Sequence, residues 1–383
     1  MPSVFRHSLF DGDLIRRLGS LWESGPSGDP WPQNPPLRSI WEGALPALRE
    51  AGEGWGASVS EYFNGPDTAV VETPVTPPSV DEVLTYHRSF EKLEEGPARE
   101  RLWRDAISRL RAEGYPHLPP ENETYASFRA RLEAVGPHLA DRIVSLRNAL
   151  TLLHNHESLG RGSPALPVAV LIGPAADYNG AFSSHRGYPL LDSLISSGRF
   201  HVLYFESADE AGARDAMMAA HEGTGRRLHT VVFAGHGLPT ALALGGPDPG
   251  ETASALGPEE AFLDINDLRA GDLGDLNAIL DPCGQVLMWS CSNGAGGAEA
   301  LNLANGVAES VPDRLVYSTP IPSNISQLLV REDLSLEITW RETEGYVASY
   351  HEGDLSVLRP EINEAQEIAA VAHGSPTNAN AAR

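Results

Sequence analysis

The stretch Leu228–Gly237, LHTVVFAGHG, and a second stretch, Gln285–Gly294, QVLMWSCSNG, decide the fold of this chain. Each is an apolar run that leads into a reactive side chain, His236 in the first and Cys291 in the second. Such runs are typical of strands buried in a parallel sheet, and ligands bind beyond the carboxyl ends of these strands. Neighbouring strands lie about 4.8 Å apart. If these two strands are neighbours, the imidazole and the thiol lie within side-chain reach, as a base and its nucleophile.

Alternating strands and helices surround the two stretches from Pro164 onward. We expect strands at 168–172, 201–205, 230–234, 286–289 and 315–318. We expect helices near 188–197, 208–221, 268–280 and 297–310. Repeated strand–helix–strand units imply an α/β fold with a mostly parallel sheet and helices on both faces. The long segment 238–267 is expected to form a hairpin or a flexible loop over the site. Segments 334–340 and 346–351 alternate like the two strands of a hairpin.

The order of the two reactive residues resembles that of the caspase-like cysteine peptidases, which include caspases, metacaspases, gingipains, separases and bacterial CHAT domains. In that group an apolar strand ending in His-Gly precedes an apolar strand ending in Ala-Cys or Ser-Cys. His236-Gly237 and Ser290-Cys291 match this order. An α/β-hydrolase has the opposite order and a G-x-[S/C]-x-G elbow, which this chain lacks. The resemblance covers roughly 164–324 and implies a caspase-hemoglobinase-like αβα sandwich.

The resemblance also implies roles for the site residues. Cys291 would be the nucleophile, His236 its general base and acid, and the backbone N–H groups of Gly237 and Cys291 the oxyanion hole. A helix starting after Ser292–Gly297 would favour a thiolate through its free amides. Singly, a cysteine at a strand end can be a small core side chain, and a histidine between glycines can be a surface turn. The joint pattern favours the dyad, whereas a phosphate-binding loop would need a Walker lysine that is missing.

Candidate substrate-binding residues leave the specificity open. Arg186 resembles the caspase arginine that binds an acidic P1 side chain, whereas Asp177 or Asp192 could hold a basic one, as in metacaspases. The metacaspase aspartate before Ser-Cys is replaced by Trp289. Each charged candidate also has an alternative role as a solvated surface group. Ser323 belongs to a proline-containing segment, 318–324, that we expect to form a wall of the substrate pocket.

Composition is that of an intracellular enzyme. The chain has 383 residues and a formal charge of −24, which argues against nucleic acid or anionic membrane as partners. Two cysteines, Cys283 and Cys291, provide no disulfide framework, and a reduced compartment suits a thiol nucleophile. Residues 1–22 lack the apolar core of a signal peptide and no segment has some 18 consecutive apolar residues, so we expect a cytoplasmic protein. We expect no cofactor and no metal, because histidines such as His154 and His156 at a helix end are usually solvated.

The chain divides into three parts. Residues 1–160 form a loop-rich, mainly helical lobe with helices in 79–114 and 121–159, 161–374 form the caspase-like domain, and 375–383 form a disordered tail. The capping box Ser79–Glu82 opens the first helical stretch. The expected function is a cysteine endopeptidase acting on protein substrates, in a regulated defence or cell-death pathway by resemblance, with the lobe controlling access or recruiting an activator. A catalytically silent binding module and acyl transfer by the same dyad are the alternatives.

Overall fold

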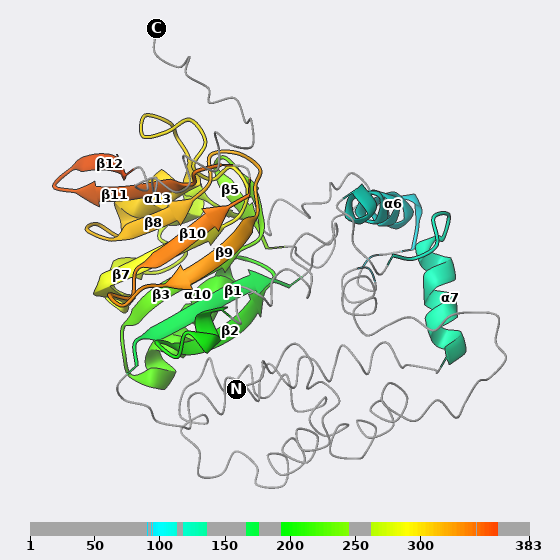
Figure 1. The fold of residues 1–383 in the computed structure, drawn as a ribbon, viewed down its shortest axis with the longest axis horizontal. Coiled ribbons are helices and arrows are strands. Elements are labelled where there is room, and N and C mark those ends of the chain that lie inside the picture. Colours follow the sequence, from blue (N-terminus) through cyan, green and yellow to red (C-terminus); the bar gives the residue numbers. More distant parts are fainter. Residues whose placement is uncertain are drawn as a thin grey trace, which may run out of the picture.

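A computed structural model describes residues 90, 93, 95–112, 118–135, 166–175, 193–244, 262–341 and 343–358. Its centre is a seven-stranded sheet in the order β12-β11-β8-β7-β3-β1-β2 (Figure 1). The strands are β1 Val168–Pro174, β2 His201–Ser207, β3 Leu228–Ala234, β7 Leu280–Trp289, β8 Leu315–Ser318, β11 Tyr346–His351 and β12 Asp354–Leu358. Strands β2, β1, β3, β7 and β8 run parallel, and β11 and β12 run antiparallel to their neighbours. The chain is therefore an α/β protein with a mostly parallel sheet, as the sequence predicts.

The five parallel strands are those expected from the apolar runs. Four of them extend beyond the predicted bounds, most of all β7, which begins at Leu280 rather than Val286. The added residues of β7 include Pro282 and Cys283, which are exposed. An apolar run marks only the part of a strand that is covered on both faces, so it understates a strand that projects past the core. Strands β1 and β3 lie inside the sheet and are buried at every residue.

The two faces of the sheet are covered by different elements. Val286 and Met288 of β7 face a core that includes residues of helices α10, Glu210–Thr224, and α13, Leu303–Ser310. Leu287 and Trp289 face the opposite way, into a core shared with the hairpin of β9, Ile325–Val330, and β10, Leu336–Trp340. Among the described residues, this second face also receives Leu194 of a short helical segment. The carboxyl ends of β3 and β7 therefore lie at the edge of the sheet, between the core covered by helices and the core covered by the hairpin.

The predicted pairing of 334–340 with 346–351 is wrong. Strand β10 pairs with β9 instead, and β11 pairs with β8 and β12 in the main sheet. Both segments alternate in the way a half-buried strand does, and alternation gives no information about which strand is the partner. A buried glutamine fixes the hairpin across the sheet: Gln285 Nε2 donates to Leu334 O at 2.7 Å and to Thr230 Oγ1 at 3.1 Å.

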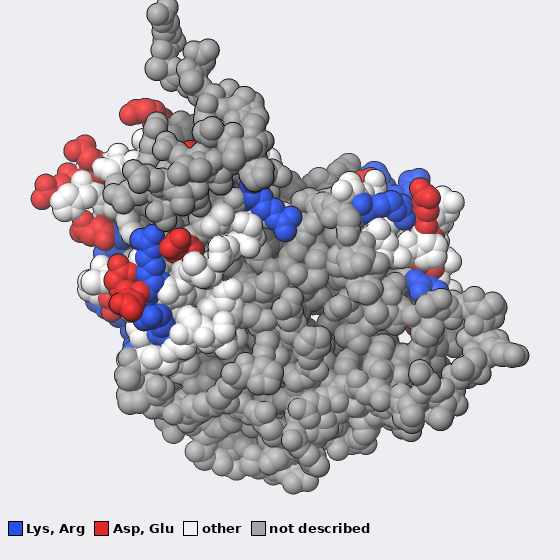
Figure 2. Space-filling model, in the orientation of Figure 1, with Lys and Arg blue, Asp and Glu red and all other residues white. Residues whose placement is uncertain are grey.

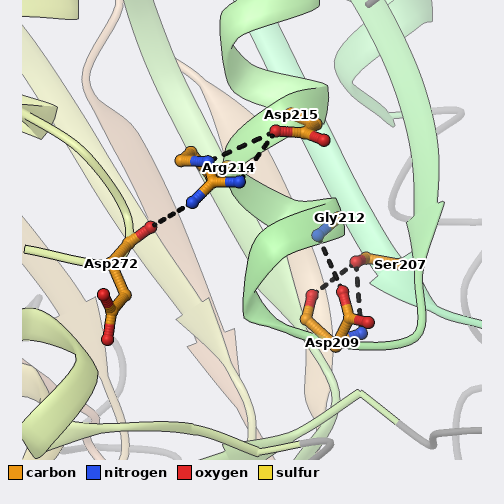
Figure 3. Close-up of polar contacts among 6 residues, drawn as sticks. All are labelled: Ser207, Asp209, Gly212, Arg214, Asp215 and Asp272. Carbon is orange, nitrogen blue, oxygen red and sulfur yellow. Dashed lines mark hydrogen bonds and ion pairs between the residues drawn. The ribbon is translucent and has the colours of Figure 1, made fainter. Parts of the chain in front are cut away.

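Helix α10 shows how side chains set the connections of this sheet (Figure 3). Asp209 caps the helix, accepting from the Gly212 amide at 2.7 Å, and the Ser207 hydroxyl donates to the Asp209 carbonyl at 2.6 Å. Within α10, Arg214 contacts Asp215 and donates to the Asp272 carbonyl at 3.2 Å. These contacts satisfy a helix start and tie α10 to the loop after α11, Ile265–Ala270.

The segment before β7 forms two short helices rather than the single helix expected over 268–280. Helix α11 ends at Gly271, and α12 covers only Leu276–Ile279. Gly271 and Gly274 both have positive φ, 82° and 73°, which stops a right-handed helix. Within the expected hairpin or loop at 238–267, three short strands form a second sheet: β4 His236–Leu238, β5 Ala241–Ala243 and β6 Phe262–Asp264. Residues 245–261 lie outside the described part.

Two helices are described in the N-terminal part, α6 Pro97–Ala112 and α7 Tyr125–Val135. They lie within the two helical stretches that the sequence predicts. Phe90, Trp103, Tyr125 and Phe128 stack as a buried aromatic cluster, and Glu100 of α6 accepts from the first amides of α7. Leu132 of α7 is buried. The capping box at Ser79, residues 1–78, 136–160 and the tail from 375 lie outside the described residues.

The described surface mixes charges of both signs. Figure 2 shows red and blue side chains next to one another on the described part of this face. None of the helices in the described ranges is long and apolar enough to cross a membrane.

Candidate active site

Strands β3 and β7, which contain the apolar runs that lead to His236 and Cys291, are neighbours in the central sheet. Strands β3 and β7 pair in parallel with Ala234 opposite Trp289, and the Gly235 amide donates to the Trp289 carbonyl at 3.3 Å. His236 and Cys291 each follow two residues after this last pair, Ala234 and Trp289. Both residues therefore leave the carboxyl edge of the sheet from adjacent strands, where ligands of open α/β sheets bind.

Gly237 packs directly against the backbone of the cysteine. A methyl group at Gly237 would lie 1.8 Å from Cys291 O and 2.5 Å from Cys291 N, so only glycine fits at this approach. The contact joins the residue after the histidine to the cysteine itself. The predicted oxyanion-hole residues, Gly237 and Cys291, thus lie side by side in the structure.

The histidine and the cysteine differ in exposure. His236 begins β4, pairs with Ala243 of β5 and is only 6% exposed. Cys291 is partly exposed, and its Sγ lies 3.9 Å from the Ser323 carbonyl. A partly exposed thiol is accessible to an incoming carbonyl carbon. Cys283, the other cysteine, is exposed in the first half of β7, seven residues before the sheet's carboxyl edge at Ser290.

Hydrogen bonds hold the loop after Cys291 in one conformation. Ser292 adopts a left-handed conformation with φ 60°, and its amide donates to Ile321 O at 3.4 Å. The Gly294 amide donates to Thr319 O at 3.0 Å. Ser323, of the predicted pocket wall, is 7% exposed. The segment after β8 therefore lies against the cysteine loop and presents the Ser323 carbonyl to the thiol.

The predicted helix start near Gly297 is wrong. Helix α13 begins at Leu303, with Asn302 as its cap, because Gly296 and Gly297 take positive φ and delay the helix. Its first amides are already bonded: Leu303 N donates to Pro239 O at 2.8 Å and Ala304 N to Asn293 O at 3.0 Å. The start of α13 therefore holds the histidine and cysteine loops, and those two amides are not available to a thiolate.

A buried tyrosine of the antiparallel strand β11 packs against the loop that follows Cys291. Tyr346 of β11 lies under Gly294, where a methyl group would approach its ring to 2.6 Å. Its hydroxyl donates to Asn305 Oδ1 at 2.6 Å. Burial raises the pKa of Tyr346, although its side-chain hydrogen bonds with Asn302 and Asn305 oppose the shift. The phenol therefore stays protonated and keeps its donor role.

Other predicted substrate-binding residues lie outside the described residues: Asp177, Arg186 and Asp192. The structure instead shows features near the site that the sequence reading missed. Arg341 is exposed, and its amide donates to Asn324 O at 2.9 Å, one residue after Ser323. Leu238 and Ile321, 38% and 42% exposed, lie on the histidine and wall segments. Their exposure is what distinguishes these two apolar residues from core residues, and the exposure of a side chain cannot be recognised from a single sequence.

Metal ligation has no candidate in the part of the chain that the structure describes. No three His, Cys, Asp or Glu side chains there come together in a way that could hold an ion. His154, His156 and Glu157 lie outside the described residues.

Comparison with protein-family models, with curated proteins and with solved structures finds no match to this chain. What the chain does must therefore be inferred from the arrangement of its own residues.

Proposed function

We propose that this protein is a caspase-like cysteine endopeptidase in which Cys291 and His236 form the catalytic dyad, on a caspase-hemoglobinase-like domain covering 161–374. One observation carries the proposal. Strands β3 and β7, which lead to His236 and Cys291, are parallel neighbours, and Gly237 approaches the Cys291 backbone so closely that no side chain fits between them. A buried structural cysteine and a surface histidine would have no need of this approach.

The proposed reaction uses the thiol of Cys291, the imidazole of His236 and two backbone amides. His236 takes the proton from the Cys291 thiol, and the thiolate attacks the carbonyl carbon of the peptide bond. The amides of Gly237 and Cys291 donate to the oxyanion that forms. The C–N bond then breaks as His236 returns the proton to the leaving amine, which leaves a thioester on Cys291. Water attacks the thioester with His236 as base, releasing the acid product and restoring the thiol.

Side chains around the proposed site suggest what a substrate would contact. Leu238, Leu301 and Ile321 are three of the five large hydrophobic side chains exposed among the described residues, and all three lie on the loops that frame Cys291. Apolar substrate side chains would cover them. Arg341 is exposed and its backbone lies next to the Ser323 segment, so we assign its guanidinium as a candidate partner for an acidic substrate side chain. Acidic and apolar residues near the scissile bond are therefore favoured over basic ones.

The cellular setting of the proposal follows the resemblance alone. We propose a cytoplasmic enzyme of a regulated proteolytic pathway, of the defence or cell-death kind, with protein substrates. The N-terminal lobe, 1–160, would control access or bind an activating protein.

Covalent labelling tests the dyad. Peptidyl acyloxymethyl ketones with Asp, Leu or Arg at P1 are incubated with wild type, Cys291→Ala, Cys283→Ala and His236→Ala, and adducts are read by intact mass. We expect one adduct that survives Cys283→Ala, disappears in Cys291→Ala and slows strongly in His236→Ala. Labelling that depends on Cys283, or no labelling with any probe at high protein concentration, would favour a catalytically silent binding module.

A further inference from the structure

A single buried side chain joins the histidine segment to the cysteine loop. Asn293 is fully buried, two residues after Cys291. Its Nδ2 donates to the carbonyls of Leu238 and Ala241, the latter at 2.9 Å. Both acceptors belong to the β4–β5 hairpin, which His236 opens. The hairpin that carries the base is therefore hydrogen-bonded to the loop that carries the nucleophile.

The remaining bonds of Asn293 fix its own orientation. The Ser290 hydroxyl donates to Asn293 Oδ1, and the Asn293 carbonyl accepts from Ala304 at the start of α13. Both hydrogens of the side-chain amide and its oxygen therefore have hydrogen-bond partners. An amide is well suited to this position, because it donates twice from one end while accepting at the other. Aspartate would place a carboxylate against two carbonyl oxygens, and a shorter side chain would leave them without donors.

We propose that Asn293 is the positioning residue of the dyad: it holds the β4–β5 hairpin so that the His236 imidazole and the Gly237 amide stay aligned with Cys291. This inference rests on the proposed function. The close contact of Gly237 with Cys291 prevents the two segments from coming closer to each other. The hydrogen bonds of Asn293 prevent them from separating. Asn293 touches neither reacting atom in this role and acts through His236.

Asn305 offers a matched control in the same region. It is also an asparagine, 4% exposed, whose Nδ2 donates to the carbonyls of Gly297, Ala298 and Ala300. Its loss would leave at least as many carbonyls without a donor. Asn305 Oδ1 also accepts from Tyr346, so Asn305→Ala removes bonds within and beneath the cysteine loop, but none of these bonds goes to the β4–β5 hairpin. A general loss of stability would therefore affect Asn305→Ala as much as Asn293→Ala, whereas loss of alignment would affect only Asn293→Ala.

The test measures alkylation of Cys291 by iodoacetamide against pH, in full-length protein with Cys283→Ser to remove the second thiol. The variants are Asn293→Ala, Asn305→Ala, His236→Ala and the double variant Asn293→Ala/His236→Ala. Asn293→Ser, which keeps a polar hydroxyl in the buried site but is too short to reach the two carbonyls, replaces Asn293→Ala if the latter does not fold. Labelling rates with the Asp and Leu acyloxymethyl ketones are measured on the same set, and thermal unfolding is followed by circular dichroism.

We expect the pH profile of Asn293→Ala to move to that of His236→Ala. Peptidyl-ketone labelling should fall about 100-fold, the loss expected from a displacement of about 1 Å, and the double variant should be no slower than His236→Ala. Asn305→Ala should keep the wild-type profile at a similar melting temperature. An Asn293→Ala profile equal to wild type, with a labelling loss no larger than that of Asn305→Ala, would overturn the inference. Identical profiles for wild type and His236→Ala would instead overturn the dyad itself.

Discussion

Replacing Gly237 by alanine tests whether the approach of the two segments matters for chemistry. The added methyl would lie 1.8 Å from Cys291 O, 2.5 Å from Cys291 N and 2.7 Å from Cys291 C. All three are backbone atoms, so no side-chain rotation relieves the clash. Restoring the 3.0 Å that real Cβ contacts keep requires a movement of about 1.2 Å between the two segments.

That movement has two consequences of different size. A displacement of about 1 Å at reacting groups costs on the order of 100-fold in rate. Overpacking of one methyl group lowers the free energy of unfolding by about 1–3 kcal/mol, which a chain of this size can absorb without unfolding. We therefore expect Gly237→Ala to fold, to melt a few degrees lower and to react with the peptidyl ketones about 100-fold more slowly.

Gly96→Ala is the matched control. A methyl group there meets no atom within 4 Å, and its φ lies outside the left-handed region. It should change neither labelling nor unfolding by more than about 0.5 kcal/mol. If the peptidyl ketones label Gly237→Ala as fast as wild type and Gly96→Ala, the close approach of Gly237 to Cys291 has no role in the reaction.

Three further predictions concern charge. Arg341→Ala should lower labelling by the Asp probe about tenfold relative to the Leu probe, since a hydrogen bond to a charged group contributes about 1.5–3 kcal/mol; an unchanged ratio of the two rates would remove Arg341 from the substrate site. Burial lowers the pKa of His229, with Asp281 opposing the shift, so below about pH 6.5 the unfolded chain binds the extra proton first and the free energy of unfolding falls. His229→Gln should show a shallower fall between pH 7 and 5 in urea titrations, and equal slopes would contradict this. Burial raises the pKa of Asp267, repulsion from neighbouring carboxylates adds to the increase, and the hydrogen bond from the Asp264 amide opposes it. The free energy of unfolding therefore falls as the pH rises above about 3.9, where the unfolded chain loses this proton first. Asp267→Asn, which can still accept that hydrogen bond, should melt higher than wild type at pH 7 and lose this advantage near pH 3.5.

The parts of the fold that depend on local pattern could be predicted from the sequence. The parallel strands are continuous apolar runs, because both of their faces are covered, and the two site residues follow such runs directly. Parallel pairing of β3 and β7 then aligns His236 with Cys291 whenever the runs end at corresponding residues. The placement of these two segments therefore followed from two short stretches.

The parts that depend on distant contacts could not be predicted. Strand β10 pairs with β9 rather than β11, and nothing in the alternation of either strand indicates its partner. Helix α13 starts late because Gly296 and Gly297 adopt positive φ, whereas the same residues in another context could lie in a helix. The role of Asn293 depends on carbonyls more than 50 residues earlier in the chain. An asparagine in a Cys-Ser-Asn-Gly sequence is equally compatible with an exposed turn.

We propose that Cys291 and His236 together cleave peptide bonds. The most direct measurement is the digestion of a proteome-derived peptide library by wild type, Cys291→Ala and His236→Ala, with new amino termini identified by mass spectrometry. New termini in wild type that disappear in both variants, with acidic or apolar residues enriched beside the cleaved bond, are the predicted result. Cleavage that persists in Cys291→Ala, or none in wild-type protein whose Cys291 reacts no faster than Cys283, would contradict it.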